Sequence, residues 1–255
     1  MVSRLKERVT LPKKNPIRPK DEIVEMVEAF IDEKQLKENE KLPSERFFCE
    51  KWGINRTTLR SALARLIKEG TVYSVPGIGY FVAEKKLIRN LQDLRPLMEI
   101  VKEQGKELKT VVLSSHLVEA DESIARMLEI EIGAKVMELI RLRYLNGVPS
   151  LLEYSYINQS LTVGLEDYDF NTNSLYDVLE EVYHVKPFGG SQRVSISYST
   201  ENEALLLQIP EGTPVFFLKG ITYKEGTKVP FEYFKSIIRS DNVKFFSTLR
   251  RKGEL

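Results

Sequence analysis

Three short runs of sequence decide the fold of the first part of the chain: Lys41-Leu-Pro-Ser-Glu-Arg46, Ile54-Asn-Arg-Thr-Thr-Leu-Arg60 and Pro76-Gly-Ile-Gly79. Ser44 is a suitable N-cap for a short helix, because its hydroxyl can accept a hydrogen bond from a free backbone N–H group. Gly53 permits a turn, and Asn55 can cap the next helix in the same way. The glycines of the third run are typical of a hairpin tip. The runs therefore predict two helices joined by a tight turn and followed by a hairpin.

The second of these helices carries a basic face at its start. Arg56 and Arg60 are four residues apart and lie on one side of the helix, about one turn from each other. Arginine can bind guanine through two parallel hydrogen bonds, and threonine can contact a thymine methyl group or a phosphate. A helix that presents such residues at its N-terminal end is typical of DNA recognition. The order of elements predicts a winged helix-turn-helix.

Composition limits the class of protein. With 42% hydrophobic and 29% charged residues, the 255-residue chain is expected to be globular. No apolar run reaches the roughly 18 residues that a spanning helix needs, so we expect a cytoplasmic protein with no membrane partner. A single cysteine, Cys49, excludes an internal disulfide. Residues 1–90 hold 19 basic and 13 acidic residues and the remainder 19 and 24, which predicts a polyanion partner for the first part alone.

The chain divides into four expected segments. Residues 1–19, rich in proline and charge, are interpreted as a basic mobile arm. Residues 20–85 form the winged helix-turn-helix domain, and residues 86–92 a linker. Residues 93–250 form a second domain of antiparallel sheet with helices, which makes the whole chain an α+β protein.

The second domain contains an internal repeat. In each copy a short amphipathic helix and a glycine precede a long apolar strand, at Lys135–Leu145 and at Pro214–Lys224. Each strand reaches a turn with glycine, and each return strand carries a Glu-Tyr pair, beginning at Glu153 and at Glu232, 79 residues apart. Two such units related by a pseudo-twofold axis are expected to merge into one antiparallel sheet.

Two arginines interrupt the first apolar strand. Arg141 and Arg143 are two residues apart and therefore lie on one face. Burying two guanidinium groups without partners is costly. Glu153 and Glu232 are candidate partners, and an anionic ligand is another, because arginine binds phosphate and carboxylate through paired hydrogen bonds. An internal Arg–Glu network or charges at a sheet edge explain these residues equally well on physical grounds.

The turn at Asn146-Gly147 provides a test of a site shared by the arginines and glutamates. A two-residue loop pairs Leu145 with Val148 and would turn Glu153 to the face opposite Arg141. A three-residue loop with a glycine bulge shifts the register by one and moves Glu153 to the arginine face. We predict the bulged loop.

The run from Lys41 to Gly79 resembles the winged helix-turn-helix of the GntR family of bacterial regulators. In that family Leu-Pro-Ser-Glu-Arg precedes the second helix, and a Ser-Arg-Thr-Thr-Val-Arg-like run opens the recognition helix. This chain departs from the pattern at Asn55, where Ser is usual, and at Tyr80, where Thr is usual. The resemblance implies that seven residues contact DNA phosphates or bases: Ser44, Arg46, Arg56, Thr57, Thr58, Arg60 and Gly77.

Residues from about 93 to 246 are similar to the UTRA effector domain of the HutC branch of that family, whose fold is like that of chorismate lyase. The shared marks are a hydrophobic-Arg-x-Arg-Tyr strand, a Leu-Glu strand, Ser-Leu-Tyr-Asp-x-Leu, Gly-Thr-Pro and a second Glu-Tyr strand. They begin at Ile140, Leu152, Ser174, Gly212 and Glu232. Members that bind sugar phosphates hold the phosphate with the paired Arg and the Ser. The resemblance thus implies an effector site made by Arg141, Arg143, Glu153, Ser174, Tyr176 and Glu232.

The expected function is that of a transcriptional regulator, a repressor, which binds a palindromic DNA operator as a homodimer. The expected effector is a small anionic metabolite such as a sugar phosphate or an amino-sugar phosphate. No P-loop, dinucleotide fingerprint or metal-ligand spacing occurs, so we expect no catalytic residue, cofactor or metal. Two alternatives stay open: an enzyme on a chorismate lyase-like fold, and a DNA-binding protein without an effector.

Overall fold

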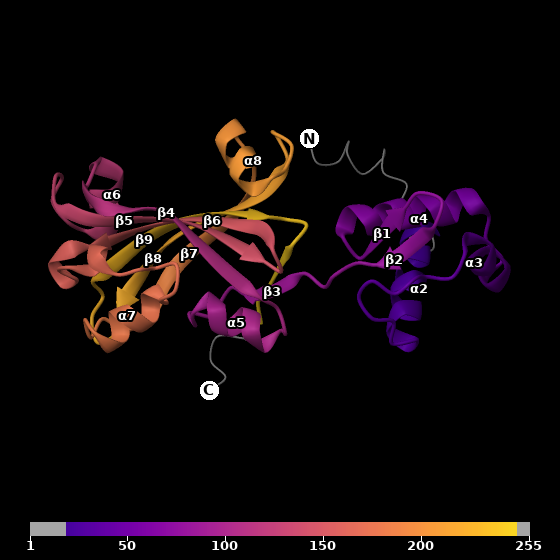
Figure 1. The fold of residues 1–255 in the computed structure, drawn as a ribbon, viewed down its shortest axis with the longest axis horizontal. Coiled ribbons are helices and arrows are strands. Elements are labelled where there is room, and N and C mark those ends of the chain that lie inside the picture. Colours follow the sequence, from indigo (N-terminus) through magenta and orange to yellow (C-terminus); the bar gives the residue numbers. More distant parts are fainter. Residues whose placement is uncertain (1–18, 249–255) are drawn as a thin grey trace, which may run out of the picture. The chain divides into compact units, whose positions relative to one another are not determined.

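The computed structural model describes residues 19–248, which divide into two compact units at Lys85/Lys86. The expected basic arm therefore lies, apart from Pro19, outside the described residues. Within residues 19–85, the first unit contains three helices and a hairpin (Figure 1). Its elements are α2 (Pro19–Glu33), α3 (Glu45–Trp52), α4 (Arg56–Glu69), β1 (Val72–Val75) and β2 (Gly79–Val82).

The helix ends of the first unit follow the sequence pattern. Ser44 Oγ accepts a hydrogen bond from Phe47 N at 3.3 Å, and Asn55 Oδ1 accepts one from Thr58 N at 2.8 Å, so each cap binds a free amide of its helix. Gly53 ends α3 in the left-handed region, with φ of 65°, where glycine carries no steric penalty. One core unites the three helices and the hairpin; its members include Val27, Phe48, Leu59, Leu63, Leu66 and Val82.

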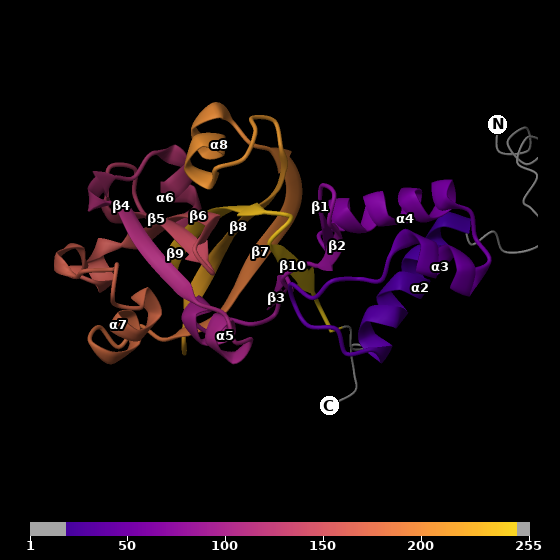
Figure 2. The same ribbon diagram turned by 45° about the vertical axis from the view of Figure 1, so that its right-hand side comes forward.

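The second unit is built on a six-stranded antiparallel sheet. Its strands are β4 (Leu108–Glu119), β5 (Lys135–Leu145), β6 (Val148–Asn158), β7 (Pro187–Tyr198), β8 (Pro214–Lys224) and β9 (Pro230–Arg239). They lie in the order β4-β5-β6-β9-β8-β7, with β4 and β7 at the two edges (Figure 2). The order is symmetric about the β6–β9 pair, and β7 begins 79 residues after β4. The predicted merger of two repeats into one sheet is confirmed.

Helices cover both faces of this sheet (Figure 1). The repeated helices α6 (Glu122–Leu128) and α8 (Glu201–Leu207) pack on one face, in separate apolar clusters. On the other face lie α7 (Leu175–Glu181) and, separately, α5 (Leu97–Glu103) with the strands β3 (Leu87–Asn90) and β10 (Val243–Phe246). Two short 3₁₀ helices complete the unit, at Gln159–Leu161 and Leu165–Asp167.

The segment between the two units differs from the prediction. Residues 86–92 are predicted to be a linker, but Leu87–Asn90 form β3, which pairs in parallel with β10. The helix α5 follows at Leu97, with Pro96 at its N-cap. A strand of four residues whose partner lies more than 150 residues away leaves no periodic pattern in the sequence, which is why β3 was not predicted.

The loop after β5 also differs from the prediction. Leu145 pairs with Val148, so Asn146-Gly147 is a two-residue loop, and the predicted three-residue loop is wrong. Both loop residues have positive φ, 47° for Asn146 and 79° for Gly147, which is the conformation of a type I′ hairpin turn.

The register nevertheless shifts by one residue, inside β6 rather than in the loop. Ser150 bulges out of the pairing, and beyond it Arg141 pairs with Glu153. Ser150 is fully buried, and its hydroxyl donates to Val148 O and accepts from Asn242 Nδ2, both at 2.8 Å. Directly paired residues of an antiparallel ladder lie on the same face. Glu153 is therefore on the arginine face, as a shared site requires.

Candidate DNA-binding and effector sites

A hollow opens on the first unit between the hairpin and the starts of α3 and α4. Four of the predicted DNA-binding residues line it, namely Ser44, Arg46, Arg56 and Gly77. Thr57 and Arg60 are exposed on the first turns of α4, and Thr58 is half-buried there. The described unit thus places cationic side chains and a glycine hairpin tip around one concave surface.

Arg60 is held by a carboxylate that the sequence analysis did not single out. Its Nε donates to both oxygens of Glu45, at 2.9 and 3.0 Å, and Tyr80 Oη donates to Glu45 Oε1 at 3.1 Å. The hydrogen bond from Arg60 holds the pKa of Glu45 below its ordinary value. Burial, reinforced by Glu45, raises the pKa of Tyr80. Glu45 thus connects the recognition helix to the hairpin.

The other predicted DNA contacts differ in how free their polar groups are. Thr58 Oγ1 donates to Asn55 Oδ1 at 2.8 Å, so its hydroxyl already belongs to the cap of α4. Arg46 Nε pairs with Glu50 at 2.7 Å, but both side chains are largely exposed. An exposed pair of this kind contributes little to stability, so a phosphate can replace Glu50 at small cost.

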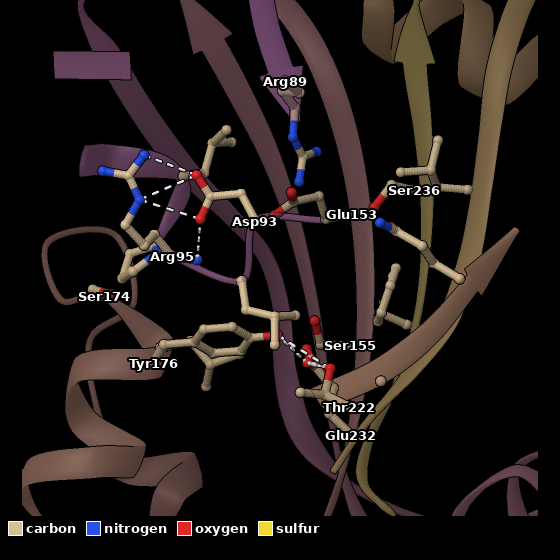
Figure 3. Close-up of a pocket in the computed structure, with 18 of the residues that line it drawn as sticks. Arg89, Asp93, Arg95, Glu153, Ser155, Ser174, Tyr176, Thr222, Glu232 and Ser236 are labelled. Atoms are coloured by element: carbon tan, nitrogen blue, oxygen red, sulfur yellow. Dashed lines mark hydrogen bonds and ion pairs between the residues drawn. The ribbon is translucent and has the colours of Figure 1, made fainter. Parts of the chain in front are cut away.

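The second unit encloses a cavity of about 500 Å³ on the face of the sheet that carries α5 and α7 (Figure 3). Residues 91–98 and 188–192 form part of its wall. All six predicted effector residues line this cavity: Arg141, Arg143, Glu153, Ser174, Tyr176 and Glu232. The structure therefore brings together residues from β5 and β6 of the first repeat, from β9 of the second, and from the start of the inserted helix α7.

Glu153 binds both buried arginines at one end of the cavity. Its Oε2 lies 2.5 Å from Arg143 Nε and 3.2 Å from Arg141 Nη2. Burial raises the pKa of Glu153, but Arg143 and Arg141 outweigh burial and lower it to about 2. Burial and Arg143 lower the pKa of Arg141 to about 10. Among residues 19–248, Arg141 Nε is buried without a hydrogen-bond partner. The internal Arg–Glu network exists, but it leaves one donor, Arg141 Nε, unsatisfied.

Glu232 lies in the same cavity with neutral partners. It is 3% exposed and accepts hydrogen bonds from Tyr176 Oη at 2.7 Å and Thr222 Oγ1 at 3.0 Å (Figure 3). Burial, together with Glu232, raises the pKa of Tyr176 well above its ordinary value. Within the described part of the chain, no cation lies within ion-pair distance of Glu232. Ser174 caps α7 by accepting from Asp177 N at 3.4 Å, which leaves its hydroxyl proton free.

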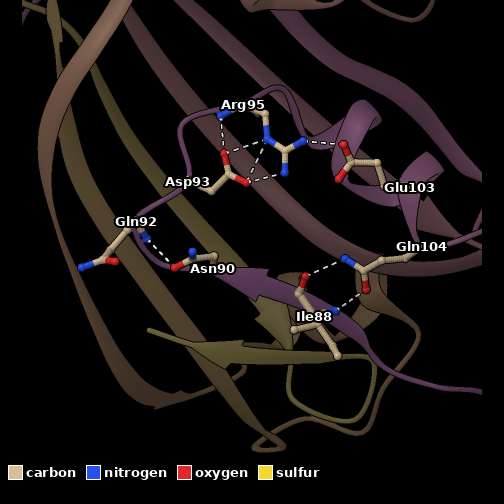
Figure 4. Close-up of polar contacts among 7 residues, drawn as sticks. All are labelled: Ile88, Asn90, Gln92, Asp93, Arg95, Glu103 and Gln104. Carbon is tan, nitrogen blue, oxygen red and sulfur yellow. Dashed lines mark hydrogen bonds and ion pairs between the residues drawn. The ribbon is translucent and has the colours of Figure 1, made fainter. Parts of the chain in front are cut away.

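Three charged residues that line the cavity were missed by the sequence analysis. Arg89 comes from β3, and Asp93 and Arg95 follow it. Arg95 pairs with Asp93 at 2.8 Å and with Glu103 at 2.5 Å (Figure 4). These residues lie in or beside the segment predicted as a linker, so nothing in the sequence placed them near the arginine strand.

Comparisons with known proteins match both units. Residues 19–82 match the model of bacterial regulatory proteins of the gntR family, and residues 103–244 match the UTRA domain. The HTH-type transcriptional repressor NagR of Bacillus subtilis is 31% identical over 244 residues, which cover 95% of this chain and 99% of NagR. The mannosyl-D-glycerate transport/metabolism system repressor MngR of Escherichia coli is 26% identical, with 91% of this chain and 96% of MngR covered.

The fold agrees with solved structures of similar proteins. The crystal structure of PhnF from Mycobacterium smegmatis superposes with a TM-score of 0.68 at 25% identity and covers 90% of this chain and all of that one. YydK from Bacillus subtilis, at 21% identity and a TM-score of 0.57, shares the fold over 92% of this chain. The matched models, the repeated UTRA sheet and the capped helix-turn-helix agree: the chain belongs to the GntR family of bacterial transcriptional regulators, in the HutC subfamily that joins a winged helix-turn-helix to a UTRA domain.

Proposed function

We propose that this regulator is a repressor whose operator binding is controlled by a small phosphorylated sugar or amino sugar bound in the cavity of the UTRA domain. The observation that carries the proposal is the unsatisfied buried Arg141 Nε beside Arg143, in a cavity of about 500 Å³. A buried donor without a partner costs free energy, and a bound anion would remove that cost. Guanidinium groups bind phosphate through paired, charge-assisted hydrogen bonds.

Glu232 accepts hydrogen bonds, whereas the arginines donate them, so Glu232 indicates which groups the rest of the ligand carries. Its carboxylate is held by two hydroxyl groups and faces the cavity without a cation, so a ligand amine or hydroxyl can donate to it. An anionic group at one end and donors at the other describe a sugar phosphate or an amino-sugar phosphate. One relative supports an anionic sugar in general, because MngR is named as the repressor of a mannosyl-D-glycerate transport/metabolism system, and mannosyl-D-glycerate carries a carboxylate.

On the output side, we propose that a homodimer binds a palindromic operator in the cytoplasm. Arg46 and Arg56 line the concave surface of the winged helix-turn-helix, and Thr57 and Arg60 are exposed on the first turns of α4. Twofold symmetry of the protein then matches two half-sites in DNA. No helix in residues 19–248 is long and apolar enough to cross a membrane. The UTRA domain acts here as a binding domain, as the regulator relatives suggest, and not as an enzyme.

A ligand screen and a DNA selection test the two halves of the proposal. Sugar phosphates, amino-sugar phosphates and small carboxylates are screened by thermal shift, because a ligand that binds the native state raises the unfolding temperature. Random duplexes selected on the full chain should yield an inverted repeat. If none of the anions stabilises the protein, the effector proposal fails. A selected site without twofold symmetry would contradict the dimeric operator complex.

The variant Arg141→Ala separates effector binding from the structural network. We expect it to bind the selected operator but to lose release by the anionic hit, with ligand affinity reduced about tenfold to a hundredfold because a hydrogen bond to a charged group is lost. Operator affinity with and without ligand, by fluorescence anisotropy, is the measurement. Arg126→Ala, an exposed arginine of α6, is the control. If Arg141→Ala unfolds the UTRA domain, the arginine is structural and the assignment is wrong.

A further inference from the structure

The strand β3 directs one arginine into the effector cavity. Leu87 is fully buried and Arg89 points the same way, whereas Ile88 between them is 46% exposed. Figure 3 shows Arg89 reaching from its strand towards Glu153. Its guanidinium carbon lies 6.0 Å from the centre of the Phe245 ring, and Phe245 is its register partner on β10. The position of Arg89 is therefore fixed by both strands of the small parallel sheet.

Arg89 adds a third guanidinium group to a site in which the arginine strand supplies two. The nearest acid, Glu153, already binds Arg143 and Arg141. Among the described residues, no carboxylate lies within ion-pair distance of Arg89, whose guanidinium group lies over the face of Phe245. Burial lowers the pKa of Arg89, Glu153 opposes this, and Arg143 lowers the pKa further. This end of the cavity thus holds three guanidinium groups around Glu153, while Asp93, the other acid that acts on Arg89, is paired with Arg95.

The strand that carries Arg89 is tied to the helix that follows it. Gln104 Nε2 donates to Ile88 O at 2.7 Å, and Ile88 N donates to Gln104 Oε1 at 2.8 Å (Figure 4). On the other edge of β3, Leu87 N donates to Asn242 O at 2.8 Å. A shift of β3 therefore involves α5, whose first residues line the cavity. The boundary between the two units lies at Lys85/Lys86, so β3 is the first element after the DNA-binding unit.

We propose that Arg89 binds the phosphate of the effector together with Arg141 and Arg143, and that this contact transmits occupancy of the cavity to the DNA-binding unit through β3. This role of Arg89 rests on the proposed function and specifies that the anionic group of the effector is a phosphate monoester. A phosphate monoester has three terminal oxygens, one for each guanidinium group, whereas a carboxylate has two. A ligand shifts a conformational equilibrium only through contacts that differ between the two states. Arg141 and Arg143 stand on β5, inside the six-stranded sheet, while Arg89 stands on β3, the first element after the DNA-binding unit.

The experiment compares Arg89→Gln and Arg89→Lys with the wild-type full chain. The probes are glucosamine 6-phosphate, inorganic phosphate and unphosphorylated glucosamine, measured by calorimetry. Operator affinity is measured at zero and at saturating probe. Arg193→Gln, which removes an exposed arginine of β7, is the matched control. We expect Arg89→Gln to bind glucosamine 6-phosphate about tenfold to a hundredfold more weakly, because it loses a charge-assisted hydrogen bond. Even at saturation, its operator affinity should change much less than that of the wild type.

The outcomes test separately whether Arg89 binds phosphate, whether it transmits occupancy to the DNA-binding unit, and whether the proposed function holds. Partial recovery by Arg89→Lys, which keeps the charge but not the paired donors, supports direct phosphate binding. If Arg89→Gln binds the probe as the wild type does, the inference is overturned. If it binds weakly yet releases the operator fully at saturation, the transmitting role is wrong. If the wild type itself binds neither glucosamine 6-phosphate nor inorganic phosphate, the proposed function fails. That result comes from the wild type alone and is therefore distinct from a failure of the Arg89 variants. A thermal melt of each variant identifies misfolding, and Arg89→Lys remains as the test if Arg89→Gln misfolds.

Discussion

Arg60 is oriented by Glu45 in the described unit, before any DNA is present. Its Nε donates to both oxygens of Glu45, which leaves the outer nitrogens of the guanidinium group free, and the half-buried Tyr80 donates to the same carboxylate from the hairpin. A side chain that is already ordered loses less conformational entropy when it binds. Tyr80 stands where the family pattern has Thr, so in this chain the hairpin helps to position Arg60, for which we propose a contact with DNA bases.

The variant Glu45→Ala tests this positioning. We expect it to bind its operator more weakly and a scrambled duplex slightly more tightly, because Arg60 becomes mobile while an acidic group near the phosphates is removed. The ratio of the two affinities should fall about threefold to tenfold, which corresponds to ordering one side chain. Glu50→Ala, which frees Arg46 on the same helix, is the control. An unchanged ratio in Glu45→Ala would show that Glu45 has no positioning role.

At the scale of elements, the predictable strands were those that carry a repeated pattern. Lys135–Leu145 and Pro214–Lys224 are long, apolar and followed by glycine turns, and they form strands with the same bounds. The edge strand β4 was missed because Leu108–Glu119 mixes polar and apolar residues without regular alternation. The prediction of the sheet face that carries Glu153 was right although the predicted loop was wrong. The shift in register comes from a buried serine, Ser150, and not from the loop. A bulge of this kind depends on a partner such as Asn242, far along the chain.

The pairing of β7 with β8 depends on glycine where the two strands approach closely. A Cβ atom at Gly220 would lie 2.3 Å from Ser191 O and 2.8 Å from Phe234 Cζ, whereas one at Gly189 would meet nothing within 4 Å. We expect Gly220→Ala to lower the free energy of unfolding by about 1–3 kcal/mol, as overpacking does. Gly189→Ala, the matched control, should change it by about 0.5 kcal/mol or less. Urea unfolding measures both, and equal losses would contradict the close approach.

At the scale of the whole molecule, charge is divided between the two functions. Residues 1–90 carry six more basic than acidic residues, and the remaining 165 carry five more acidic than basic ones. The excess of positive charge therefore accompanies the unit that meets a polyanion. The cavity of the acidic part draws on buried guanidinium groups, whose interactions are screened less by salt than those on the surface. The first 90 residues should therefore determine most of the salt dependence of operator affinity.

Operator binding should therefore weaken steeply with salt, with a slope of log affinity against log salt of about −0.9 for each phosphate neutralised. Arg46→Gln should reduce the magnitude of that slope by about 2 in a dimer, since Arg46 is exposed beside the hairpin hollow and each protomer loses one phosphate contact. Arg193→Gln, an exposed arginine of the acidic part, should leave the slope unchanged. Anisotropy titrations at several salt concentrations give the slopes. Equal slopes for Arg46→Gln and the wild type would remove Arg46 from the phosphate contacts, and a change of about 1 would indicate that a single protomer touches the DNA there.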